Sequence, residues 1–170
     1  MRLMATESDV PMAIARQLGA AIDMLDNALT ACPDVLWDDG VGPRAFWYVA
    51  FNAIFWLDLY LFGSVEGFTP PAPFTLDELD PAGIIPDRPY ARTELRDYLA
   101  HCRRRLREAI AGLAAGGADR RCRFGWGEAS YLELLLYNLR HVQHHVGQLN
   151  LLISRETGSA PRWVAVSPPR

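Results

Sequence analysis

The sequence predicts an all-α fold, a four-helix bundle that forms one domain over residues 1–170. Apolar residues recur at intervals of three and four along four long segments, and the alternation typical of strands is almost absent. The length suits one domain and is enough to bury a sizeable core. The four helices are expected at 8–31, 43–62, 93–115 and 128–155.

The first predicted helix has clear signals at both ends. Ser8 or Thr6 can cap it, and Pro11 is tolerable only in a first turn. The run Cys32-Pro33-Asp34 ends it. Its apolar stripe consists of Ile14, Leu18, Ala21, Leu25 and Ala28.

The second predicted helix is the most aromatic part of the chain, opened by Pro43 and ended by Gly63. It is apolar nearly all round, which predicts heavy burial. Asn52 and Asp58 would both be costly inside a bilayer, so we interpret this segment as a core helix and expect no membrane insertion.

A long Pro-rich crossover, residues 64–91, joins the second helix to the third. It contains six prolines and enough apolar residues to pack against the bundle. Connections of this length are usually functional, disordered or packed as a cover. We expect an ordered crossover with one helical turn near 75–79, where Thr75 and Glu78 form a capping-box pattern.

The third and fourth predicted helices are separated by Gly116-Gly117 and a short arginine-rich segment. The arginines at 120, 121 and 123 are expected in a solvated loop. The buried face of the third helix is predicted to consist of Leu95, Leu99, Leu106, Ile110 and Leu113.

The fourth helix carries polar residues where a bundle helix normally has apolar ones. Alternating steps of four and three define a seam along one side of this helix, beside its apolar stripe. Buried polar groups must be hydrogen-bonded or bound to something. The sequence therefore predicts that the functional site lies on this seam, at Asn138, His141, His145 and Gln148.

His141 and His145 are spaced so that both imidazoles can converge on one transition metal. The motif is not that of the HExxH proteases, because Val142 follows His141. The alternative is a pair of core histidines satisfied by Asn138, Gln148 and water. His144 points about 100° away from its neighbour and is expected at the rim.

Composition restricts the partners and the compartment. The formal net charge is −3, which argues against nucleic acid as the main partner. The three cysteines are odd in number and lack CxxC spacing, and the first ten residues lack an apolar signal core. A reducing cytoplasm is the expected location.

Residues 134–150, LLLYNLRHVQHHVGQLN, resemble the last helix of the DinB-like (DinB/YfiT) family of metalloenzymes. The aromatic second helix and the closing segment 160–164 also fit, so the resemblance covers nearly the whole chain. It implies an up-up-down-down bundle, often a homodimer. It also implies a divalent transition metal, zinc or nickel, held by three histidines. Two of these correspond to His141 and His145.

The third histidine of the family has no counterpart here, because Asn52 stands at the matching position of the second helix. A catalytic zinc site typically keeps three protein ligands and one open position. Asn52 is therefore either a weak third ligand or part of a pocket without metal. Asn138, Gln148 and Asp58 are expected to line the pocket or support the ligands, unless Asp58 pairs with Arg140 or another arginine.

Two functions follow from the resemblance to the family and from the departure at Asn52. The first is a metal-dependent hydrolase or low-molecular-weight-thiol transferase with an atypical site that includes Asn52. The alternative is a non-catalytic relative with a degenerate metal site. Such a relative would bind a small ligand or act through its dimer surface.

Overall fold

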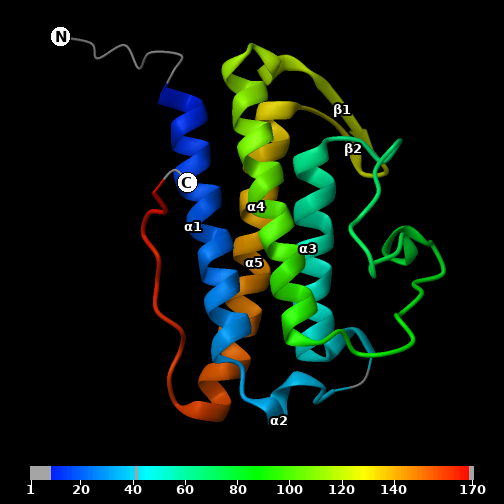
Figure 1. The fold of residues 1–170 in the computed structure, drawn as a ribbon, viewed down its shortest axis with the longest axis vertical. Coiled ribbons are helices and arrows are strands. Elements are labelled where there is room, and N and C mark those ends of the chain that lie inside the picture. The colour runs from blue at the N-terminus through cyan, green and yellow to red at the C-terminus, as the bar shows by residue number, and fades with distance from the viewer. Residues whose placement is uncertain (1–8, 41, 169–170) are drawn as a thin grey trace.

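The computed structural model describes residues 9–40 and 42–168, and in it four long helices pack into a bundle (Figure 1). The all-α prediction is confirmed, since the remaining elements within the described residues are short. Gly63 and Gly158, both left-handed, end the second and fourth long helices, as the sequence predicts for Gly63. The long helices are α1 (Asp9–Ala31), α3 (Phe46–Phe62), α4 (Arg92–Ala114) and α5 (Tyr131–Thr157).

The order of helix directions differs from the up-up-down-down arrangement that the resemblance implied. Figure 1 shows α1 running down, α3 and α4 running up and α5 running down, which is an up-down-down-up bundle. Contacts agree, because Asn138 and Tyr131 of α5 bond the α3 carbonyls of Leu57 and Leu61 in antiparallel order. The expected arrangement needs two end-to-end connections, and the chain has one, residues 63–91.

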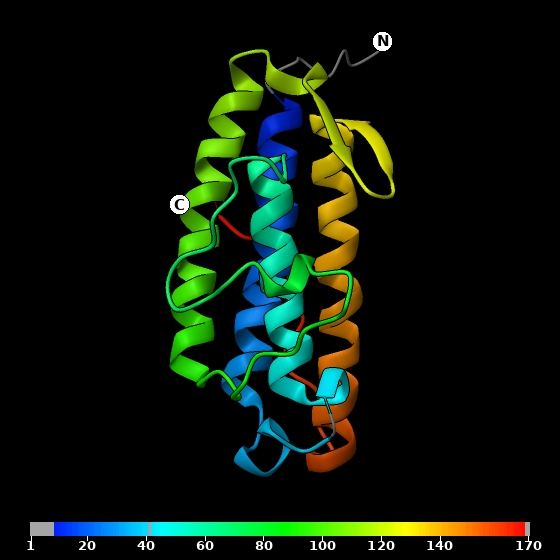
Figure 2. The same cartoon turned by 90° about the vertical axis from the view of Figure 1, so that its right-hand side faces the viewer.

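The crossover packs as a cover over α3, as predicted. Figure 2 shows it passing across the outer face of α3, and its Phe68, Phe74 and Tyr90 are buried. One 3₁₀ turn, Asp77–Leu79, lies where a helical turn was expected. Glu78 does not cap this turn, because its carboxylate reaches the side chains of α3 instead.

A short hairpin replaces the loop that was expected before the last helix. Strands β1 (Arg121–Phe124) and β2 (Gly127–Ser130) pair in antiparallel fashion. Arg121 and Arg123 lie on one face, and both form ion pairs with Glu128. The last helix therefore begins at Tyr131, where the Ser130 hydroxyl accepts a hydrogen bond from the Glu133 amide.

Connections at the other end of the bundle are short. A four-residue helix, α2 (Asp34–Trp37), and a 3₁₀ turn, Gly42–Arg44, link α1 to α3. Helix α3 consequently begins at Phe46, three residues later than Pro43 predicted.

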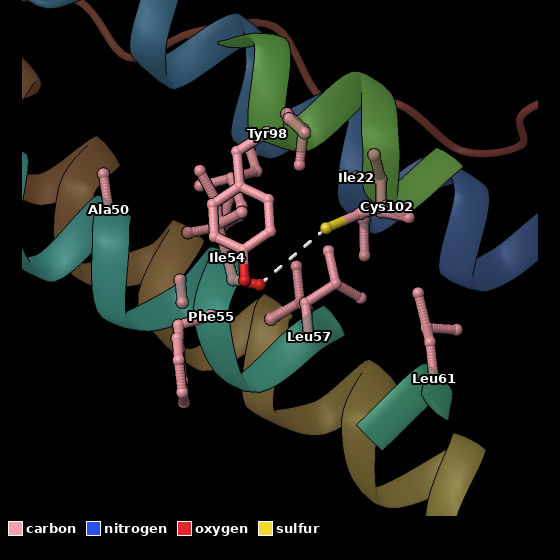
Figure 3. Packing of buried hydrophobic residues seen from close by; sticks show 14 of the residues in the cluster. Ile22, Ala50, Ile54, Phe55, Leu57, Leu61, Tyr98 and Cys102 are labelled. Atoms are coloured by element: carbon pink, nitrogen blue, oxygen red, sulfur yellow. Dashed lines mark hydrogen bonds between the residues drawn. The ribbon is translucent and has the colours of Figure 1, made fainter. Parts of the chain in front are cut away.

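The core centres on α3, which is buried on most of its circumference, as its composition predicts. Figure 3 shows Ile54 and Leu57 of α3 on the side of Tyr98 and Cys102 of α4, all within the hydrophobic core. Phe55 points away from them, and its ring meets that of Phe68 in the crossover edge-on at 5.6 Å. The Cys102 thiol donates a weak hydrogen bond to the Ile54 carbonyl oxygen at 3.8 Å, and Cys102 is otherwise part of the hydrophobic core. Across 9–40 and 42–168, the structure contains no helix that is both long and apolar enough to traverse a bilayer.

Candidate functional site

His141 and His145 lie next to each other on α5, as their spacing predicts. Their ring centroids are 4.6 Å apart, and the ring planes are inclined by 73°. Nδ1 of His145 is 2.7 Å from the amide oxygen of Gln148, which can only accept a hydrogen bond. The proton therefore lies on Nδ1, and Nε2 of His145 keeps its lone pair for a ligand.

The His141 ring is enclosed more deeply. Its Nε2 is buried and has no hydrogen-bond partner in the described part of the chain. The Tyr60 ring packs edge-on against it at 6.0 Å between centroids. Burial, and then the neighbouring His145, lower the pKa of His141 to about 3, so the imidazole is neutral at physiological pH.

Burial along the polar seam decreases from Asn138 to Gln148. Asn138 is fully buried, and its amide nitrogen donates to the Leu57 carbonyl oxygen at 3.0 Å. The two histidines are partly buried, whereas Gln148 is exposed. The predicted buried seam is thus present at the Asn138 end, and the other end opens to solvent.

Asn52 takes part in a different set of contacts. Its amide nitrogen donates to one carboxylate oxygen of Glu78, and the Tyr48 hydroxyl donates to the other at 3.0 Å. Burial raises the pKa of Glu78, while the hydrogen bonds from Asn52 and Tyr48 act in the opposite direction. Asn52 is therefore held by the crossover, and no hydrogen bond joins it to His141 or His145 among the described residues.

Sequence reasoning missed the role of Glu78. The capping pattern with Thr75 assigned its carboxylate to a local helix end. No local feature of the sequence directs this carboxylate inward, since the neighbouring Leu76 is itself 47% exposed.

Asp58 lies on the side of α3 that faces α4, away from the histidine pair. It is fully buried, and its carboxylate is 2.5 Å from Nε of Arg105 and 3.3 Å from Nε2 of His101. The Tyr98 hydroxyl donates to it at 3.2 Å. The partner of Asp58 is therefore an arginine of α4, and not Arg140.

The donors around the histidine pair fit two metal ligands but not three. Nε2 of His141 has no partner, and Nε2 of His145 keeps its lone pair. Within 9–40 and 42–168, however, no three side chains among histidine, cysteine, aspartate and glutamate are grouped so that they could hold a metal ion. Asn52, the remaining candidate, is neutral and bound to Glu78. The side chains present therefore do not reproduce a three-ligand hydrolytic centre.

An open groove runs beside the histidine pair on α5. A stack of aromatic rings backs one end of it, since Trp126 at the hairpin tip lies 4.8 Å from the Tyr137 ring and 18° from its plane. Phe124 stacks on Trp126 in turn, at 5.7 Å. The lining residues are Tyr137, Arg140, His141, Gln143 and His144.

The chain is thus a helical-bundle protein of up-down-down-up order that carries a histidine pair on its last helix. The family model of the DinB superfamily matches residues 17–149, and the chain belongs to this superfamily. The matched region includes Asn52, His141 and His145. A search of the curated proteins found no match.

Proposed function

We propose that the chain is a non-catalytic member of the DinB superfamily that binds a small molecule beside His141 without a metal centre. One observation carries the proposal: Asn52, at the position of the missing helix-2 histidine, is bound to Glu78 of the crossover. The bond uses the Asn52 amide nitrogen, so only its neutral carbonyl oxygen is left for a metal. That oxygen is a poorer ligand for zinc or nickel than the imidazole it would replace.

A small ligand is favoured by the unpartnered nitrogen of His141. A buried polar atom without a hydrogen bond costs about 1–3 kcal/mol, and a ligand or water that bonds it recovers this free energy. The adjacent groove gives access to the ring from solvent. The lining combines one aromatic ring with polar side chains, and polar groups of this kind fix the orientation of a small molecule.

The metal half of the proposal is tested by titrating zinc and nickel into untagged protein by calorimetry. The parent chain and an Asn52→His variant are compared, with Asn27→His on α1 as a control for a histidine placed elsewhere. We expect the Asn52→His variant to bind zinc about 100-fold more tightly than the parent, because a third imidazole completes the ligand set. Tight one-to-one binding by the parent, equal to that of the variant, contradicts the proposal.

The ligand half is tested with benzamide, a neutral probe, using the ring signals of the four histidines in NMR spectra. We expect benzamide to shift the His141 ring signals and to leave those of His101 unchanged, since His101 is paired with Asp58 in another part of the bundle. If neither benzamide nor benzoate shifts the His141 signals, this half of the proposal is wrong.

A second candidate is the metal-dependent hydrolysis or transfer of a low-molecular-weight thiol, with zinc or nickel as the metal. The orientation of His145 by Gln148 favours it, because metal-bound histidines usually donate their other nitrogen to such a partner. Stoichiometric zinc or nickel in untagged protein, measured by elemental analysis, would establish this candidate in place of the first.

The compartment and the assembly state belong to the same proposal. We infer a reducing cytoplasm from Cys32, Cys102 and Cys122, which are buried and unbridged. The homodimer implied by the resemblance stays a prediction. Light scattering on untagged protein should give twice the mass of one chain.

A further inference from the structure

The groove beside His141 carries positive charge that nothing in its lining neutralises. Arg140 lines it, and none of its lining residues is a carboxylate. Nor is Arg140 among the arginines that form ion pairs within the described residues. An arginine guanidinium binds a carboxylate through two parallel hydrogen bonds, so the groove is chemically suited to that group.

Aromatic rings provide the second part of the groove. Tyr137 lines it, and the Tyr60 ring meets Tyr137 edge-on at 5.3 Å, with the two planes at 90°. Trp126 stacks on Tyr137 and so fixes its orientation. Trp126 is 46% exposed, so part of its indole is open to solvent beside this wall. A flat ring in the groove can therefore make edge or stacking contacts with this wall.

The His141 nitrogen supplies a third, directional contact. It is buried, unpartnered and next to the same groove, one position along the helix from Arg140. The His141 ring is part of the groove lining, so a ligand that reaches from the guanidinium towards the aromatic wall lies against this imidazole. The charge, the rings and the unpartnered nitrogen thus favour a small, flat ligand with one polar end.

We propose that the groove binds a small aromatic carboxylate, with its carboxylate on Arg140 and its ring against Tyr137. This inference rests on the proposed function, because it names the chemical class of the small molecule. His141 bonds the occupant or its bridging water, and Trp126 holds the aromatic wall in place.

The experiment compares benzoate with benzamide, which has nearly the same shape but no charge. Dissociation constants are measured by NMR titration of the histidine ring and Trp126 indole signals in three proteins: the parent, Arg140→Gln and Arg104→Gln. Arg104 is an exposed arginine of α4 outside the groove and serves as the matched control. We expect the parent and Arg104→Gln to bind benzoate about two- to fivefold more tightly than benzamide, as for a solvent-accessible charge pair. Arg140→Gln should bind the two probes equally.

Acetate and inorganic phosphate separate the contribution of the ring from that of the charge. We expect both to bind more weakly than benzoate and to leave the Trp126 indole signal unchanged. Binding of acetate or phosphate as tight as that of benzoate would overturn the aromatic part of the inference. Unchanged benzoate binding by Arg140→Gln would overturn its anchor.

Failure of this inference is distinguishable from failure of the proposed function. If benzamide shifts the His141 signals and benzoate binds no better, the carboxylate class is wrong and the small-molecule pocket stands. If the parent binds zinc as tightly as Asn52→His, the proposed function is wrong, whatever the benzoate result.

Discussion

The imidazole of His141 shows how one buried side chain couples the site to pH. Its pKa in the folded chain is about 3, compared with 6.5 for an ordinary histidine, because burial and His145 disfavour the charged form. Between these values the unfolded chain binds a proton that the folded chain does not. The contribution of His141 to stability is therefore complete above pH 6.5 and is lost as the pH falls towards 3.

A His141→Gln variant should reduce this pH dependence. Between pH 7 and pH 4 the parent should lose about 2–3 kcal/mol of unfolding free energy through this group, and the variant should not. Urea denaturation at both pH values measures the difference. His144→Gln is the matched control, since His144 is an exposed histidine of the same helix and its variant should keep the slope of the parent. An identical slope in His141→Gln would rule out the buried, neutral imidazole as its source.

Glu78 is a carboxylate whose pKa is also shifted by burial, in this case upwards. Its two oxygens accept hydrogen bonds from Asn52 and Tyr48, so burial of the charge is offset by directed donors. The Asn52 amide nitrogen is therefore held by the Glu78 carboxylate. Position 52, where the resemblance implies a histidine, thus carries an asparagine with a specific polar contact to the crossover.

At the scale of helices, the α3–α4 contact depends on a charged cluster inside an apolar interface. Asp58 of α3 is fully buried and pairs with Arg105 of α4, whose guanidinium also lies over the Phe62 ring at 5.1 Å. Burial raises the pKa of Asp58, although Arg105 and His101 act to lower it. The charged pair therefore stabilises the interface only while both members are present.

Removing one member should be much worse than removing both. Asp58→Ala leaves Arg105 without its counter-ion, and we expect a loss of about 3–5 kcal/mol in unfolding free energy. The double variant Asp58→Leu/Arg105→Met replaces the pair with apolar side chains of similar volume and should recover most of this loss. Urea denaturation of the three proteins gives the comparison. A double variant no more stable than Asp58→Ala would indicate that the pair contributes in some other way.

The four long helices were predictable because their signals are local. Apolar spacing, Pro33 after α1 and Gly63 after α3 act within a few residues of the boundaries that they define. The hairpin was not predictable in the same way, since its four-residue strands are too short to show alternation clearly. Its pairing also depends on Arg121 and Arg123 meeting Glu128 across the turn.

The contacts of the candidate site also divide into local ones, which were predictable, and long-range ones, which were not. The contact of His141 with His145 follows from helical spacing, and it was predicted. The contact of Asn52 with Glu78 joins residues 26 apart through an irregular crossover, and that of Asp58 with Tyr98 joins residues 40 apart. Neither has a local signature, because the first depends on the path of the crossover and the second on which helix faces α3.

At the scale of the whole molecule, helix order follows from the lengths of the connections. Helix α2 and the 3₁₀ turn Gly42–Arg44 lie between α1 and α3 at one end of the bundle, so α1 and α3 are antiparallel. The crossover 63–91 returns along the bundle, so α3 and α4 are parallel. The crossover also places Glu78 against α3, where it accepts a hydrogen bond from Asn52. The helix order and the contacts of Asn52 therefore depend on the same segment.

The C-terminal segment packs against α1 at Ser167, and Gly19 leaves room for the Ser167 side chain. The Ser167 amide donates to the Arg16 carbonyl oxygen at 3.2 Å, and Ser167 is buried. A Cβ atom added at Gly19 would lie 3.1 Å from the Ser167 Cβ, whereas one added at Gly112 of α4 would contact nothing within 4 Å. The two glycines therefore separate helix propensity from packing against the tail.

Gly112→Ala should raise the unfolding free energy by about 0.5–1 kcal/mol, because alanine has the higher helix propensity. Gly19→Ala should gain the same propensity but displace Ser167, so we expect little or no net stabilisation. Displacement should also make the tail more susceptible to protease, and limited proteolysis followed by mass spectrometry measures cleavage near residue 160. If Gly19→Ala is stabilised as much as Gly112→Ala and its tail is cleaved no faster than that of the parent, the tail does not depend on this contact.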